Sequence, residues 1–403
     1  MLNKEINISK YNKKGQGLPQ EYNSIEMLNK LVSFETISSE SNLDMIMFIK
    51  DYLNSFGIYS HLVFNDDKTK ANLFAQIGPN VEGGVLLSGH TDVVPVEGQN
   101  WQTNPFKVTA KNNRLFGRGT CDMKGFNSLI LAAVPTLIRT KLKKPIQIAL
   151  SYDEEIGCLG APRMIKEIKK ILPKAAAVIV GEPTNLQIVD GHKTSVGIKT
   201  HVKGFEVHSS LMHTGVSAVM NASKLVAWLG EETEKNKIMQ PDPEDIQFDP
   251  PYSTLHVGTI KGGTAGNITA KDCTFSLDIR CLPREDSQTW IKKYKNYVSL
   301  VERDMRAINR STEVKVEVAH IVPGLKPEIN CFAEHLVRTV TRKNGTRKVS
   351  YGTEAGQFQK AGYSTIICGP GSIKQAHQPN EFIEKSQLDE GEKFISGLIH
   401  SIC

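Results

Sequence analysis

Short apolar stretches that alternate with helical patterns are the feature that most constrains the fold of this chain. The expected strands lie at residues 72–77, 84–88, 146–152 and 175–180. Apolar residues with helical spacing cover residues 25–32, 43–56, 123–138 and 161–171. Uniformly apolar strands between helices are typical of an α/β sheet that helices cover on both faces. The first part of the chain is therefore predicted to form an α/β domain.

The pattern changes near residue 192. Apolar and polar residues alternate in expected strands at residues 273–281 and 313–320, and helical patterns cover residues 216–229 and 287–307. Strands with one polar face indicate an α+β layer. An α/β pattern returns after residue 323, with a strand at 364–368 and a helix at 386–402. We therefore expect an α/β domain in two segments, residues 1–191 and 323–403, and an inserted α+β domain at residues 192–322.

Composition excludes several classes of protein. The net charge is +6 over 403 residues, and the basic residues are spread along the chain, so a nucleic-acid partner is not expected. No stretch approaches the roughly 18 apolar residues that a membrane span needs. Seven cysteines without a CxxC pair favour a reducing, cytoplasmic compartment. The first twenty or so residues are polar and lack the apolar core of a secretory signal, so they are interpreted as a loosely held leader.

Polar residues follow the expected strands at the point where each strand ends. They are His90 and Asp92 after the second strand, Glu154 and Glu155 after the third, and Glu182 after the fourth. Open α/β sheets bind their ligands at this edge. We therefore expect these side chains to lie close together.

Imidazole and carboxylate groups of this kind are the ligands of divalent metal ions. His90 and Asp92 point the same way because they are two residues apart, so His90 could bind a metal while Asp92 orients its ring. A structural His–Asp pair is the alternative. Asp122 could bridge two metals, or it could cap the helix that follows it. His377 lies in a loop rich in glycine and proline, where a plain surface histidine is the alternative.

The adjacent carboxylates of Glu154 and Glu155 repel each other unless a cation neutralises at least one of them. The alternative is an ordinary surface pair, because adjacent acidic residues are common on protein surfaces. Counted together, two histidines, one bridging aspartate and two glutamates fill two zinc sites. One glutamate is then left to act as a base. The sequence therefore predicts a two-metal hydrolytic centre.

Five segments together resemble the M20 family of co-catalytic metallopeptidases and deacylases. They are SGHTDVVP (88–95), GRGTCDMKG (117–125), DEEIGCLG (153–160), GEPT (181–184) and the loop that holds His377. The resemblance implies a zinc-exopeptidase-like α/β catalytic domain with an inserted dimerisation, or lid, domain, and hence a homodimer. Within the family, TEAGQF (353–358) and GPGSIKQAHQPNEF (369–382) are most similar to the acetylornithine deacetylases.

The resemblance also implies a ligand set. His90 and Glu182 would bind one Zn²⁺, Glu155 and His377 the other, and Asp122 would bridge them, with Co²⁺ as a possible substitute. Glu154 would then be the catalytic base, and Asp92 would support catalysis beside His90.

The insert resembles the family's lid domain at several positions. His208 matches a histidine that reaches the partner subunit's active site and steadies the oxyanion, and Asn267 and Arg280 match residues that hold the substrate. A guanidinium on the polar face of a strand suits bidentate binding of a carboxylate, although a local ion pair of Arg280 with Asp278 is the alternative. Further substrate contacts are expected at two residues of the C-terminal loops, Thr353 and Gly371.

The activity implied is hydrolysis of N2-acetyl-L-ornithine to L-ornithine and acetate, a step of arginine biosynthesis. Another M20 enzyme remains an alternative, such as succinyl-diaminopimelate desuccinylase, an aminoacylase or a dipeptidase. A metal-stabilised binding protein without catalysis is the alternative of a different class.

Overall fold

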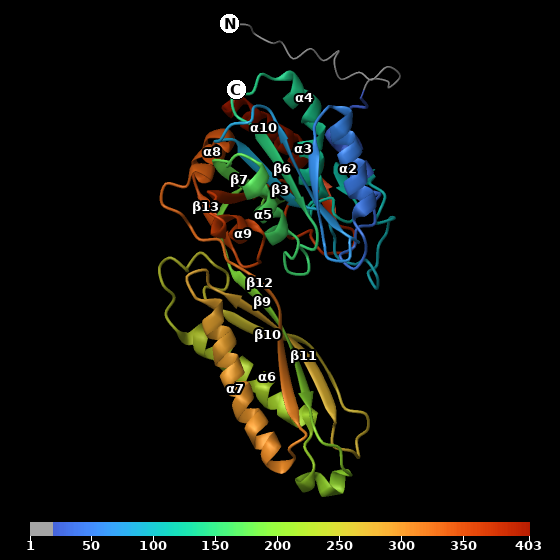
Figure 1. The fold of residues 1–403 in the computed structure, drawn as a ribbon, viewed down its shortest axis with the longest axis vertical. Coiled ribbons are helices and arrows are strands. Elements are labelled where there is room, and N and C mark those ends of the chain that lie inside the picture. Colours follow the sequence, from blue (N-terminus) through green and yellow to red (C-terminus); the bar gives the residue numbers. More distant parts are fainter. Residues whose placement is uncertain (1–18) are drawn as a thin grey trace. The chain divides into compact units, whose positions relative to one another are not determined.

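The computed structural model describes residues 19–403, which divide into two compact units (Figure 1). Unit 1 comprises the described residues up to Ile188 together with Asn330–Gly345 and Ala361–Cys403. Unit 2 combines Val189–Ile329 with Thr346–Lys360. Nearly all of the leader expected from the sequence lies outside the described residues.

Unit 1 is built on a sheet whose central strands are buried. In spatial order its strands are β1 (Ser60–Phe64), β2 (Ala71–Ile77), β6 (Ile146–Ser151), β3 (Val85–His90), β7 (Ala177–Pro183) and β14 (Thr365–Gly369). β3 pairs parallel with both β6 and β7, and β14 pairs parallel with β7, whereas β2 pairs antiparallel with both β1 and β6. Every residue of β3 and β6 is buried, as expected where helices cover both faces of a sheet.

The helices of unit 1 are α1 (Ser24–Val32), α2 (Leu43–Ser55), α3 (Lys124–Ala132), α4 (Val134–Arg139), α5 (Ala161–Ile171), α8 (Phe332–Thr341) and α10 (Lys385–Ser401). Apolar side chains of α1, α2, α3, α8 and α10 form one core with the sheet. A capping box of Asn23 and Glu26 begins α1. The single helix expected over residues 123–138 divides at Ala133, because Pro135 lacks an N–H group and is tolerated only in a first helical turn.

A second, small sheet of unit 1 joins distant parts of the chain. Its strands are β15 (Phe382–Glu384), β5 (Arg114–Phe116) and β4 (Thr109–Lys111) in that order, all antiparallel. The segment just after His377 is therefore fixed beside the segment just before Asp122.

Unit 2 contains an antiparallel sheet in the order β10 (Thr254–Gly262), β11 (Asp272–Cys281), β9 (Thr194–Lys203) and β12 (Glu313–Val322). The long helices α6 (Ala218–Ile238) and α7 (Ser287–Ile308) lie along one face of this sheet (Figure 1). Burial alternates along β11, so one face of that strand packs in the core. Shorter elements are β8 (Ile188–His192), η2 (Ser209–Thr214), β13 (Thr346–Val349) and α9 (Ala355–Lys360).

The predicted fold class, an α/β domain interrupted by a smaller α+β domain, is confirmed. Within residues 19–403, no helix combines the length and the apolarity that crossing a membrane requires.

Candidate metal centre

The carboxyl ends of three neighbouring parallel strands bring the predicted ligands of unit 1 together. His90 is the last residue of β3, Glu182 is the next-to-last residue of β7, and Glu154 and Glu155 follow β6 in a short loop. Parallel strands end at the same edge of a sheet, so these side chains converge. His90, Asp122 and Glu182 are all buried.

Asp122 lies between two histidines. Its Oδ1 is 3.0 Å from Nε2 of His90, and its Oδ2 is 3.4 Å from Nε2 of His377. The same nitrogen of His377 is 2.9 Å from Oε2 of Glu155. One carboxylate therefore faces a histidine on either side, which is the arrangement that a bridging ligand needs.

Two groups of side chains are compact enough to bind an ion. His90, Glu154 and Glu182 form one, and His90, Asp122 and Glu155 form the other; within each group the potential ligand atoms lie within 4.8 Å of one another. Glu154, the predicted base, therefore lies as close to His90 and Glu182 as a ligand would.

Burial dominates the electrostatics of the cluster. It raises the pKa of Glu154 to about 8 and the pKa of Glu155 to about 7, and it raises the pKa of Glu182 well above its ordinary value. Burial acts the same way on Asp122, but hydrogen bonds with His377 and His90 outweigh it and lower the pKa of Asp122. Hydrogen bonds with Asp122 and Glu155 raise the pKa of His377 to about 10. The cluster therefore holds more negative charge than its burial tolerates without cations.

An unsatisfied oxygen supports the same conclusion. Oε1 of Glu182 is buried and has no hydrogen-bond partner. A buried carboxylate oxygen without a donor is costly, whereas a divalent cation would satisfy it. Imidazole nitrogens and carboxylate oxygens are also ligands that Zn²⁺ takes. The residues present thus fit a two-metal centre.

Asp92 contacts its neighbours differently from the arrangement expected. Nδ1 of His90 lies 2.8 Å from the backbone oxygen of Asp92 but 3.6 Å from its carboxylate Oδ1. The carboxylate accepts the backbone N–H groups of Glu154 (3.1 Å) and Glu155 (3.2 Å) and the hydroxyl of Ser38 (2.7 Å). The carbonyl of Asp92 therefore orients the ring, and its carboxylate holds the loop that presents both glutamates.

The remaining predicted residues, apart from Gly371, belong to unit 2. His208 and Asn267 are exposed and adjacent there, because His208 bridges to Ile268 and the N–H of Ser209 donates to the backbone oxygen of Asn267 at 2.9 Å. Nδ1 of His208 lies 2.8 Å from the hydroxyl of Ser210. The two side chains thus occupy one part of the surface of unit 2.

Arg280 and Thr353 have local partners in unit 2. Nε of Arg280 donates to Oδ2 of Asp278 at 2.9 Å, so the local ion pair considered from the sequence is formed. Thr353 is fully buried, and its hydroxyl accepts the N–H of Ala355 at 3.1 Å, where α9 begins. A substrate contact by either residue stays a prediction.

Gly371 of unit 1 is held by its backbone. Its N–H donates to Oε1 of Gln387 at 3.1 Å, and its oxygen accepts the N–H of Asn185 at 2.6 Å. Its φ is +83°, and a Cβ would lie 2.7 Å from Sγ of Cys121. The position therefore requires glycine for packing alone, and its contact with substrate also stays a prediction.

Comparison with known proteins identifies the family. Residues 86–401 match the family described as peptidase family M20/M25/M40. The chain belongs to this family. Acetylornithine deacetylase of Pasteurella multocida (strain Pm70) is 31% identical over 389 residues, which cover 94% of this chain and 98% of that protein.

Solved M20 structures share the fold. An M20-family metallo-carboxypeptidase from Sulfolobus solfataricus aligns with a TM-score of 0.76 at 19% identity, over 93% of this chain and 98% of that one. A protein from Bacillus subtilis, described as a dinuclear metal-binding peptidase of the M20 family, aligns with a TM-score of 0.62 at 12% identity, over 94% and 97%. The fold is thus that of M20 metallopeptidases.

An ion pair beside the candidate metal centre of this M20 chain was not predicted from the sequence. Arg118 and Glu381 are both buried, with Nη1 of Arg118 2.7 Å from Oε2 of Glu381. Both stand inside segments that carried the resemblance, but they are 263 residues apart and no local pattern links them. The only indication in the sequence was that each segment holds a charged residue, Arg118 or Glu381, near a predicted metal ligand.

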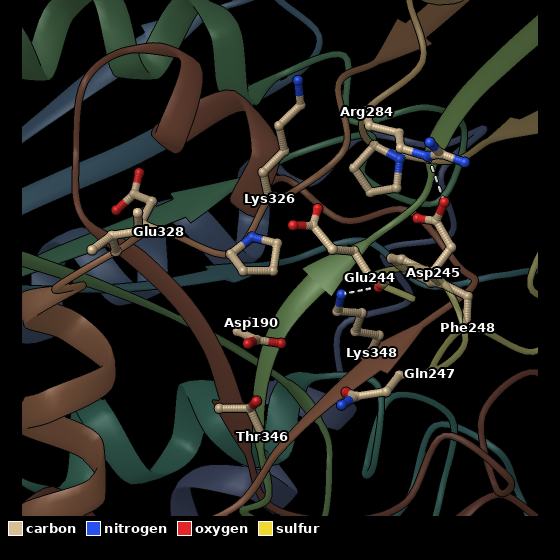
Figure 2. Close-up of a pocket in the computed structure, with 13 residues that line it drawn as sticks. Asp190, Glu244, Asp245, Gln247, Phe248, Arg284, Lys326, Glu328, Thr346 and Lys348 are labelled. Carbon is tan, nitrogen blue, oxygen red and sulfur yellow. Dashed lines mark hydrogen bonds and ion pairs between the residues drawn. The ribbon is translucent and has the colours of Figure 1, made fainter. Parts of the chain in front are cut away.

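A pocket of about 440 Å³ in unit 2 of the M20 chain contains none of the predicted site residues (Figure 2). Arg284 forms an ion pair with Asp245 there, and Lys348 donates to the backbone oxygen of Glu244. These contacts pair two of its cationic groups, those of Arg284 and Lys348, with oxygens of the pocket itself.

Proposed function

We propose that this chain is a two-zinc amidohydrolase that converts N2-acetyl-L-ornithine to L-ornithine and acetate, a cytoplasmic step of arginine biosynthesis. The observation that supports this most directly is the buried cluster in which Asp122 faces both His90 and His377. The choice of substrate is supported by the relative named acetylornithine deacetylase, which matches 94% of the chain.

The ligands proposed for one ion are His90 and Glu182, and those for the other are Glu155 and His377, with Asp122 shared. Zn²⁺ is the expected ion and Co²⁺ a substitute. When bound, such ions lower the pKa of water and polarise a carbonyl group, which supplies the nucleophile for amide hydrolysis at neutral pH.

Glu154 is proposed as the base because the other acids of the cluster suffice as ligands. Its carboxylate accepts a proton from the attacking water while the new C–O bond forms at the acetyl carbon. It then donates that proton to the ornithine nitrogen as the C–N bond breaks. Asp92 contributes by holding the backbone N–H of Glu154 at 3.1 Å, which fixes the loop from which the base projects.

Residues of unit 2 are proposed to bind the substrate. His208 of the partner subunit stabilises the oxyanion, and Arg280 binds the substrate carboxylate in exchange for part of its contact with Asp278. Asn267 and Thr353 of unit 2, together with Gly371 of unit 1, complete the proposed set.

A homodimer is supported by the apolar surface beside His208. Leu211 and Met212 follow it in η2 and are 51% and 64% exposed, and Ile268, which bridges to it, is 38% exposed. Apolar groups gathered in this way are typical of a surface that a partner covers. A second copy of the chain is the partner that the proposal names.

A panel of N-acyl amino acids tests the function. The purified protein, supplied with Zn²⁺ or Co²⁺, is assayed with N-acetylornithine, N-succinyl-diaminopimelate and N-acetylmethionine. We expect the highest kcat/KM for N-acetylornithine. A higher value for another substrate would assign a different M20 deacylase activity, and binding of metal without hydrolysis of any N-acyl amino acid or dipeptide would identify a binding protein.

A further inference from the structure

The carboxylate of Glu381 is buried and accepts four N–H groups. Oε2 accepts from Nη1 of Arg118 at 2.7 Å and from the backbone of Gly119 at 3.0 Å. Oε1 accepts from the backbone of Cys121 at 2.8 Å and of Asp122 at 3.1 Å. An ionised carboxylate has about four lone-pair positions, so its capacity to accept is filled.

Three of these donors are backbone groups of the loop that presents Asp122. Gly119 allows the loop to close around the carboxylate, because its φ is +80° and a Cβ there would lie 2.8 Å from Val93. Glu381 therefore sets the position of Asp122 through the backbone N–H groups of Gly119, Cys121 and Asp122.

The same network reaches the loop of His377. Nη2 of Arg118 donates to Oε1 of Gln99 at 2.6 Å, and Nε2 of Gln99 donates to the backbone oxygen of His377 at 3.0 Å. The indole of Trp101 donates to the same oxygen of Gln99 at 3.0 Å and lies beside the guanidinium. One buried cation thus connects the loops of two proposed ligands.

A purely structural explanation is weak for this pair. Burying two charges is costly, and apolar residues of similar volume often stabilise a fold as well or better. What an apolar pair could not do is accept the backbone N–H groups of Gly119, Cys121 and Asp122. A buried carboxylate at position 381 is thus explained by its hydrogen bonds to the loop that presents Asp122.

We propose that Glu381 and Arg118 are positioning residues of the metal centre, which hold Asp122 and His377 at the separation that two ions require. Neither residue touches the ions or the substrate in this scheme, and the inference rests on the two-metal function proposed above.

The test compares Glu381→Gln with a matched control, Glu384→Gln. Glu384 lies three residues further on, in β15, and forms an ion pair with Arg114 of β5 at 2.8 Å, but this pair is about two-fifths exposed and lies outside the loop of Asp122. A glutamine at position 381 directs an NH₂ group at two of the four donors. Both proteins are first shown to be folded by circular dichroism at the temperature of the titration.

Zinc dissociation constants are measured by competition with a chromophoric chelator. In Glu381→Gln we expect at least one site to weaken by about 10- to 100-fold, as when an outer partner of a ligand is lost. The visible spectrum of the Co²⁺ protein should change too, because the ligand geometry changes. Glu384→Gln should bind two ions with wild-type constants and give the wild-type spectrum.

Two wild-type zinc constants and an unchanged cobalt spectrum in folded Glu381→Gln would overturn the inference and leave the proposed function intact. A wild-type protein that binds no zinc would instead overturn the proposed function, and the inference with it. If Glu381→Gln does not fold, Gln99→Met serves, since this partly buried residue donates to the backbone oxygen of His377. In Gln99→Met we expect the zinc affinity of one site to fall by about threefold or more. Unchanged zinc binding would refute the positioning role of this network.

Discussion

Asp92 and Glu154 are joined by a hydrogen bond of 3.1 Å from the backbone N–H of Glu154 to Oδ1 of Asp92. The adjacent oxygen of Asp92 accepts from the next residue, Glu155, so a single side chain fixes the proposed base and a proposed ligand together. Substitution of Asp92 should therefore affect both catalysis and metal binding.

Asp92→Asn should lower kcat by about 10- to 100-fold and weaken zinc binding, because the amide NH₂ cannot accept one of the two N–H groups. Steady-state kinetics and zinc titration check this. Ser38→Ala is the milder control. It removes only the hydroxyl that donates to Asp92 at 2.7 Å, so it should lower kcat by several-fold at most. Wild-type kinetics in Asp92→Asn would contradict the role.

Glu154→Gln should lower turnover by about 10² to 10⁴, because the amide cannot take a proton from water. Both ions should remain bound, since the proposed ligands are intact. The measurement pairs kcat with zinc content by elemental analysis. Near-full turnover in the variant would show that another group is the base.

His377→Ala should reduce the zinc content from two ions per chain towards one. His377 is half exposed and contacts Asp122 and Glu155 only through its ring, so its loss should leave the fold unchanged. Elemental analysis after dialysis checks the stoichiometry. Retention of two ions at wild-type affinity would exclude His377 as a ligand.

His192 of unit 2 should make the protein sensitive to acid. Burial, helped by the charge of Arg280, lowers the pKa of His192 to about 4, and its ring is held neutral between the backbone oxygen of Lys193 (2.9 Å) and the N–H of Gly356 (3.2 Å). The unfolded chain takes up this proton near pH 6.5. The stabilisation is therefore complete above about pH 6.5 and is lost as the pH falls towards 4.

Urea unfolding at pH 7 and pH 4.5 measures this contribution. His192→Gln should show a smaller fall in the free energy of unfolding than wild type, by about 2.5 kcal/mol over that interval. His256→Gln, an exposed position of β10, should behave like wild type. Equal pH dependence in His192→Gln and wild type would contradict the assignment.

Leu211→Asp should favour the monomer, because it places a charge in the apolar surface beside His208. Activity should fall together with dimer content if His208 acts across the interface. Sedimentation velocity and kcat are measured on the same samples. Ile238→Asp, 82% exposed at the end of α6, is the control. A Leu211→Asp protein that remains dimeric would exclude this surface.

Local sequence patterns were sufficient to predict β2, β3, β6, β7 and β14 of unit 1, and the polar residues at the ends of β3, β6 and β7, but not β1 or the small sheet of β4, β5 and β15. Burial imposes apolar runs on β3, β6 and β7, so the position where each run stops is visible in the sequence. The break between α3 and α4 was missed because the apolar spacing continues across Pro135. Strand β10 was missed as well, since most of its residues are exposed and give little apolar pattern.

Contacts between distant segments could not be predicted, because no local pattern in the sequence indicates them. Glu381 and Arg118 pair across 263 residues, and the preference of Asp92 for the N–H groups of Glu154 and Glu155 depends on how β3 lies beside β6. Such contacts depend on the folded arrangement of the backbone, so they become visible only when the sheet is assembled.

The pairing of β15 with β5 has a consequence for biosynthesis. A ribosome makes the loop of Asp122 long before it makes Glu381, and His377 comes almost as late. Until those late residues emerge and dock, a nascent chain carries its early acidic side chains without the groups that fix them. The proposed centre can therefore be completed only after the residues around His377 and Glu381 have been made and have docked.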